Sequence, residues 1–207
     1  LLDRAKEIGV NNQSNDISNF LISMMKFDHK LFDETYDLCI KNKGFDLTFY
    51  QEICTLLNHI GELWACKTIS PAHERFISTM VKQKLLLRIE TNKTQSNKQD
   101  HTYVLYLPEN EMHDIGLLFV HCKLIERGFH SVYLGHSVPI EDLKTMSTVF
   151  SKISFISYFT VEPKTQDVDQ YLKKIDKEVL SKTNAVSHIL GRNTRGITTE
   201  MKRIHAY

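Results

Sequence analysis

The chain has 207 residues, of which 26 are basic and 25 acidic, so its formal net charge is only +1. This balance gives no general electrostatic basis for binding nucleic acid. No apolar run approaches the roughly 18 residues that span a bilayer, and the start shows no signal-peptide pattern. The four cysteines are scattered without a Cys-x-x-Cys pair, which indicates neither a zinc site nor a disulfide framework. We therefore expect a cytoplasmic protein without membrane contacts, and the missing initiator methionine indicates a piece of a longer one.

The first part of the chain reads as helices, from residue 16 to about residue 90. Apolar residues keep a helical spacing over 17–40, with one short break, and again over 47–64. Ser70-Pro71 then begins another helix, with proline in its first turn. Four helices joined by short polar links predict a compact bundle.

A change of rhythm follows a polar stretch. Residues 91–100 contain no apolar side chain, a composition that marks a boundary or a mobile connection. We therefore expect a helical bundle over residues 1–92, a linker over 93–101 and a second domain over 102–207.

Strands and helices alternate in this second domain. The expected strands are 103–107, 131–134, 153–159 and 185–190, and the expected helices are 114–127, 140–150, 167–180 and 198–205. Such alternation predicts a parallel sheet with right-handed crossovers, a doubly wound α/β domain of the Rossmann-like kind. Ligands of such sheets bind beyond the carboxyl ends of the strands.

One short motif lies at that end of the first expected strand. Glu111 precedes His113 by two residues, so its carboxylate can hold one imidazole nitrogen while the other faces a ligand. Gly116 leaves the backbone bare three residues later, so a large flat group can approach closely. Asp114 beside the histidine could take part in acid–base work, but no second partner for it is evident. A lone histidine at a strand end is more often a surface or capping residue, yet the place of this one favours a ligand site.

This motif resembles the Asp/Glu-x-His-x-x-Gly motif of cobalamin-binding domains, and residues 101–205 are similar to that fold. The resemblance implies that His113 is the lower axial ligand of cobalt in adenosyl- or methylcobalamin. It also implies that His113 replaces the nucleotide tail base, which then enters a slot between the sheet and the helices.

Further cofactor contacts are implied by the same resemblance. Ser157, in the Ser-Tyr-Phe element after the third strand, would hydrogen-bond the tail base, and Gly191 would leave room for it. Asp114, and Val138 in the loop after the second strand, join the cofactor-binding candidates. Arg192 stands in place of the second glycine of the family's pair, and its bulk and charge argue against an open slot.

The helical half sharpens the assignment. Trp64, followed after nine residues by Glu74, resembles the bundle of cobalamin-dependent MerR-type regulators, which include light-sensing repressors. The resemblance implies that these two residues cover the upper face of the corrin, for which tryptophan offers a large rigid plate. A core role for this tryptophan is the alternative. Ala65 stands where the photoreceptor members carry a histidine, which argues against light sensing.

Two functions from different classes follow. The first is the ligand-sensing and oligomerisation region of a MerR-type transcriptional regulator, a homo-oligomer that reaches DNA only through an upstream domain. The second is a corrinoid carrier protein of a methyltransferase system, and a related fold that no longer binds cobalamin is a further alternative. A carrier needs an accessible cobalt face, so a face covered by Trp64 favours the sensor. We expect no enzyme, because the sequence has no nucleophile elbow, phosphate-binding loop or His-Glu-x-x-His motif.

Overall fold

The computed structural model describes residues 15–93, 98–194 and 201–207. The chain divides into two compact units, a helical unit over Leu1–Lys84 and a sheet unit over Leu85–Tyr207. Every helix in the described ranges is too short or too polar to cross a membrane. The boundaries of 92 and 102 that the sequence indicates for the two domains stay predictions.

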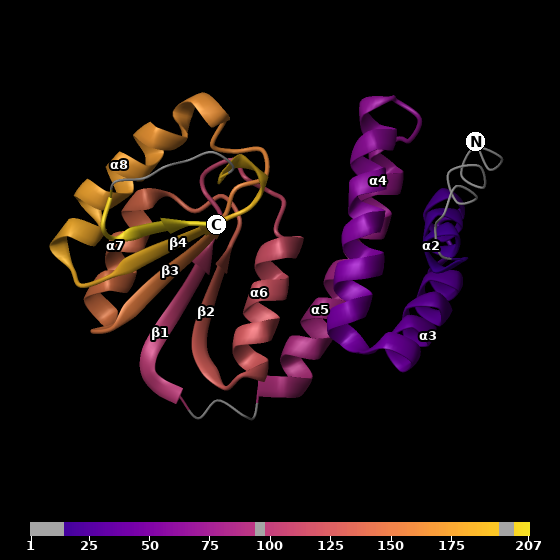
Figure 1. Ribbon diagram of the computed structural model, residues 1–207, viewed down its shortest axis with the longest axis horizontal. Helices are drawn as coiled ribbons and strands as arrows, with labels where there is room; N and C mark the ends of the chain where they lie inside the picture. Colours follow the sequence, from indigo (N-terminus) through magenta and orange to yellow (C-terminus); the bar gives the residue numbers. More distant parts are fainter. Residues whose placement is uncertain (1–14, 94–97, 195–200) are drawn as a thin grey trace. The chain divides into compact units, whose positions relative to one another are not determined.

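The helical unit confirms the predicted bundle (Figure 1). Its elements are α2 (Asn15–Lys26), α3 (His29–Leu47), a π-helical turn (Thr48–Ile53), α4 (Cys54–Ala65) and the first part of α5 (Pro71–Asn92). Asp28 begins α3, since its side chain accepts a hydrogen bond from the Leu31 N–H at 3.0 Å. Apolar side chains on α2 and α3 meet in the core, where the rings of Phe20 and Phe32 lie 5.1 Å apart.

The sheet unit confirms the predicted parallel sheet. Its strands are β1 (Lys98–Tyr106), β2 (Phe129–Gly135), β3 (Ile153–Tyr158), β4 (Val186–Leu190) and β5 (Ile204–Ala206), and its helices are the end of α5, α6 (Ile115–Glu126), α7 (Ile140–Val149) and α8 (Val168–Glu178). All neighbouring strands are parallel, in the order β2-β1-β3-β4-β5 (Figure 1). The chain leaves β1 toward one edge of the sheet and β3 toward the other. The order therefore reverses between β1 and β3, which is where such sheets form a crevice for ligands.

Each face of the sheet has its own core. On one face α7 and α8 pack against side chains such as Phe155 and Phe159, and on the other α6 packs against Leu105 and Ile156. Successive residues of β3 thus serve opposite faces, as a pleated strand requires. This alternation determines which of the predicted site residues can meet.

Two expectations about the elements were wrong. The helix expected over 198–205 is contradicted at its end, where β5 (Ile204–Ala206) forms an edge strand beside β4, while residues 195–200 lie outside the described residues. Three residues are too few to show a strand period in the sequence. The first strand also begins earlier than expected, at Lys98 inside the polar stretch, where Lys98 pairs with Phe129 before the register shifts.

Candidate functional site

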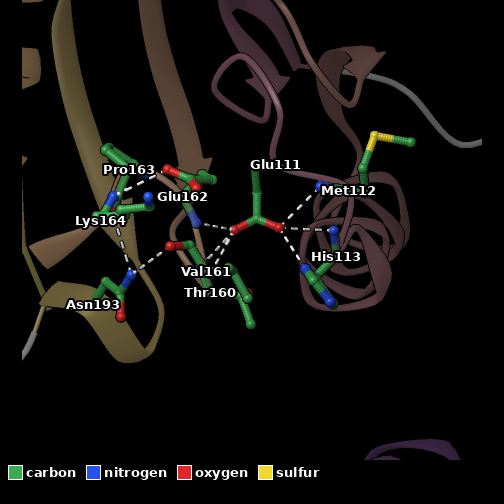
Figure 2. Close-up of polar contacts among 9 residues, drawn as sticks. All are labelled: Glu111, Met112, His113, Thr160, Val161, Glu162, Pro163, Lys164 and Asn193. Atoms are coloured by element: carbon green, nitrogen blue, oxygen red, sulfur yellow. Dashed lines mark hydrogen bonds and ion pairs between the residues drawn. The ribbon is translucent and has the colours of Figure 1, made fainter.

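The centre of the site is a buried carboxylate at the point where the strand order reverses. The side chain of Glu111, in the loop after β1, is fully buried, and both of its oxygens accept backbone hydrogen bonds (Figure 2). Oε1 accepts from the N–H groups of Met112 and His113, each at 2.9 Å. Oε2 accepts from three successive N–H groups after β3, those of Thr160, Val161 and Glu162, at 3.1, 2.6 and 2.8 Å. One side chain therefore joins the two loops at the crevice.

Glu111 remains ionised in this setting. Burial alone would raise the pKa of its carboxyl, but the hydrogen bonds from the His113 imidazole and from the backbone of Val161, Glu162 and His113 lower it from 4.5 to about 2. A carboxylate with so many donors is stable as an anion away from water. It can therefore only accept hydrogen bonds at neutral pH.

His113 is oriented by this anion. Its Nδ1 lies 2.6 Å from Oε1 of Glu111, and its side chain is 56% exposed. Because the carboxylate accepts, Nδ1 carries the proton, and the lone pair of the neutral ring is on Nε2. The arrangement is the carboxylate–histidine pair that fixes the tautomer of metal-binding imidazoles. The structure thus brings Glu111 and His113 together as the sequence predicts.

A third loop braces the first two. The Asn193 side chain, after β4, donates to the carbonyl oxygens of Val161 and Pro163 at 3.2 and 3.1 Å (Figure 2). Gly191 has a φ of +110°, and a Cβ on it would lie 2.3 Å from the carbonyl oxygen of Phe159. The backbone at Phe159 therefore approaches so closely that a side chain at position 191 would clash with it. Arg192 beside it is exposed.

Gly116 is also in close contact with the protein itself. It lies in the first turn of α6, where an added Cβ would be 2.8 Å from Cζ and 2.9 Å from Cε2 of Tyr158, the last residue of β3. The flat group that lies against this glycine in the structure is thus the ring of Tyr158.

Ser157 faces the other side of the sheet. It is fully buried and pairs in register with Tyr106, whose phenol is likewise buried. Burial raises the pKa of Tyr106 to about 12, against the lowering effect of the neighbouring hydroxyls of Tyr171, Ser157 and Ser187. The structure therefore does not bring Ser157 and Gly116 together, and the tail contact of Ser157 stays a prediction.

Two other candidates support the loops from within. Asp114 is the N-cap residue of α6, is almost fully buried and accepts a hydrogen bond from the Tyr133 hydroxyl at 3.4 Å. Val138 is buried too, and its N–H donates to the carbonyl of Leu107 at 2.9 Å. Both residues thus tie neighbouring strand ends together, and their contact with a cofactor stays a prediction.

Trp64 and Glu74 belong to the helical unit. Trp64, in the last turn of α4, is 54% exposed, so the alternative of a core role is wrong. Glu74, in the first turn of α5, accepts a hydrogen bond from the Ser78 hydroxyl at 3.1 Å. An exposed indole is available for a ligand, and its role as a corrin cover stays a prediction.

Sequence reasoning missed three parts of the site. They are the row of N–H groups over Thr160–Glu162, the bracing amide of Asn193 and the ring of Tyr158. The first two lie after β3 and β4, where a parallel sheet collects its loops, so their place was open to prediction. Their partners were not, because backbone donors leave no signature in side-chain identity.

Comparison with known proteins adds a relationship and a fold. No family model matches the chain. Over 101 residues it is 32% identical to the HTH-type transcriptional repressor CarH of Myxococcus xanthus, a match that spans 49% of this chain and 31% of that protein. The chain thus spans about a third of this curated relative.

A solved structure shares the fold. The monomethylamine corrinoid protein of Methanosarcina barkeri superposes with a TM-score of 0.71 over 91% of this chain and 90% of its own, at 12% identity. The methanol:cobalamin methyltransferase complex MtaBC of the same organism gives a TM-score of 0.44 over 98% of this chain and 77% of its own, at 14% identity. The predicted relationship and the predicted architecture are thereby confirmed: the chain carries a region related to the repressor CarH, on the fold of a corrinoid protein.

Proposed function

We propose that the sheet unit binds a cobalamin, with Nε2 of His113 as the lower ligand of cobalt. The pair of Glu111 and His113 carries this proposal, because a buried anion fixes an exposed imidazole in the tautomer that a metal needs. Cobalt in a corrin already has four ring nitrogens, so one protein ligand suffices below it. The relationship to CarH and the fold shared with a corrinoid protein support the same ligand.

The surroundings of His113 suit a large, mostly apolar plate. Met112 and Val161, whose N–H groups hold the Glu111 carboxylate, are each 52% exposed, so two apolar side chains near His113 are accessible to a ligand. Exposed apolar groups around an oriented polar one are typical of ligand sites. The residues present therefore fit the lower face of a corrin.

The residues around His113 orient its imidazole and set which nitrogen carries the proton. Bound cobalamin supplies the cobalt and its upper ligand. Glu111 holds the proton on Nδ1 of His113 and makes the ring a better electron donor through Nε2. The N–H groups of Val161 and Glu162 keep that carboxylate ionised, and so keep the imidazole in one orientation.

The biological role that we propose is that of a sensor. Adenosyl- or methylcobalamin would bias the association of this homo-oligomeric region, and an upstream domain of the full regulator would contact DNA. Trp64 and Glu74 would cover the upper face of the corrin. We expect no light response of the photoreceptor kind, since Ala65 has no side chain that can ligate cobalt, and no enzymatic activity of the region itself.

A corrinoid carrier is the second candidate function. It is favoured by one observation, the overlap of 91% of this chain with the monomethylamine corrinoid protein. Light scattering with and without adenosylcobalamin separates the two. A ligand-dependent change of association state supports the sensor, whereas an unchanged state argues for the carrier.

Binding itself is tested by absorbance titration in the dark with hydroxo- and adenosylcobalamin. We expect a saturable shift that reports replacement of the tail base by a protein histidine. His113→Ala should weaken binding by at least about tenfold, the lower range for perturbing a metal site. His136→Ala, which removes another exposed histidine after β2, is the matched control and should bind normally. Equal affinity of the His113 variant and the wild type would exclude this ligand.

A further inference from the structure

The ring of Tyr158 packs directly against Gly116. Three atoms of the Tyr158 ring, Cζ, Cε2 and Cε1, lie 2.8, 2.9 and 3.2 Å from the place that a Cβ on this residue would take. The first two separations are shorter than real Cβ atoms show and the third is tighter than most, so the ring takes this position because the residue is glycine.

Backbone conformation does not explain this glycine. Its φ lies outside the positive range that favours glycine, in contrast to Gly191 and Gly135. Glycine inside a helix is unfavourable relative to alanine. The reason for Gly116 is therefore space, in a recess between the first turn of α6 and the end of β3.

This recess lies within reach of a ligand on His113. The two residues are three positions apart, a distance of at most about 11 Å along an extended chain. If His113 holds cobalt, the flat aromatic base of the nucleotide tail would be free of the metal and would need its own place on the protein. The recess is on the face of the sheet opposite Ser157, so a base bound here would not make the contact predicted for that serine.

We propose that Tyr158 occupies the recess that receives the nucleotide base, so that the base binds only after the tyrosine ring has moved out. This inference rests on the proposed function. Tyr158 thus acts as a gate that decides how much the aromatic tail contributes to affinity. A ligand that needs an open state binds more weakly by the fraction of molecules in that state.

The ring has a way out. Tyr158 is only partly buried, at the last position of β3, and the N–H groups that hold Glu111 begin two residues later. Rotation of one side chain would therefore open the recess without disturbing the Glu111–His113 pair. The gate acts on the tail and leaves cobalt ligation unchanged.

Comparison of cobalamin with cobinamide separates binding of the nucleotide base from binding of the corrin ring. Cobinamide has the corrin ring but lacks the nucleotide base, so the recess does not matter to it. Tyr158→Val should tighten cobalamin binding by about tenfold or more, as expected if the recess is open in about one molecule in ten or fewer. Its affinity for cobinamide should stay within about twofold of the wild type. Tyr158→Phe keeps the ring and should leave both affinities unchanged.

Tyr103→Val is the matched control for lost packing. Tyr103 packs against the same apolar cluster as Tyr158, but on β1, before the strand reaches the loops. This variant should not alter the ratio of cobalamin to cobinamide affinity. The wild type gives an independent readout, since saturating cobalamin, but not cobinamide, should increase nitration of Tyr158 by tetranitromethane in peptide mass spectra.

The outcomes are distinct. An unchanged affinity ratio in Tyr158→Val, or no change in nitration with cobalamin, overturns the gate while corrinoid binding through His113 stands. Absence of any His113-dependent spectral shift with both ligands overturns the proposed function, and the gate with it.

Discussion

Replacement of Glu111 by glutamine tests the anion at the centre of the site. The amide is almost isosteric, but it brings an NH2 group toward the N–H donors that surround both carboxylate oxygens. In either orientation at least two donors lose their acceptor. The lowering of the pKa from 4.5 to about 2 corresponds to about 3 kcal/mol of stability at neutral pH. We expect Glu111→Gln to lose about this much free energy of unfolding.

The direction of the pH dependence follows from the lowered pKa of Glu111. The folded pKa is below the unfolded one, so the contribution of Glu111 is fully present above about pH 5 and is lost as the pH falls toward about 2. Between pH 7 and pH 3 the wild type should lose about 2 kcal/mol through this group alone. The difference between wild type and Glu111→Gln should shrink by the same amount, because other titrating groups cancel.

Urea denaturation followed by circular dichroism at pH 7 and pH 3 measures both quantities. Glu109→Gln is the control, because Glu109 is an exposed carboxylate in the same loop and its loss should change stability by less than about 0.5 kcal/mol. A Glu111 variant within 1 kcal/mol of the wild type, or a difference that does not depend on pH, would refute the account of the buried anion.

Two further predictions concern the frame of the sheet unit and its protonation. Gly191→Ala should destabilise the protein by about 3 kcal/mol, because the residue has a positive φ and a Cβ would clash with Phe159. Gly61→Ala is the control: Gly61 has open space around it, so the change should be neutral or slightly stabilising, and thermal unfolding distinguishes the two variants. His121 is buried and hydrogen-bonded to Ser131, and burial and the charge of Lys93 lower its pKa to about 4. The stability that the neutral imidazole contributes is therefore present above pH 6.5 and lost as the pH falls toward 4. An NMR titration should give a midpoint near 4, and a midpoint near 6.5 would contradict this.

The sequence contains the local part of the site but not its long-range part. Glu111 and His113 are two residues apart, so their hydrogen bond follows from spacing alone. The contacts of Glu111 with Thr160–Glu162 span about fifty residues and depend on the strand order. That order, in which β1 and β3 are neighbours, depends on contacts between distant segments and has no local signature in the sequence.

The side to which a strand residue points was harder to predict. Ser157 and Tyr158 are adjacent, and the family motif draws attention to the serine. In the structure the serine faces Tyr106 and the tyrosine faces Gly116, on opposite faces of the sheet. A shift of one residue in register exchanges the two faces, and no pattern within six residues of mostly apolar strand fixes it.

The contacts of Glu111 also decide how a His113 variant must be interpreted. Five backbone N–H groups hold the carboxylate, and one of them is the N–H of residue 113 itself, which alanine retains. The exposed imidazole adds only one further hydrogen bond to Oε1. His113→Ala should therefore keep the loops joined and lose less stability than Glu111→Gln. If the histidine variant unfolds as the wild type does and yet fails to bind cobalamin, the loss belongs to the ligand and not to the fold. Equal destabilisation by the two variants would instead mean that the imidazole is part of the scaffold, and its loss of binding would carry no information about cobalt.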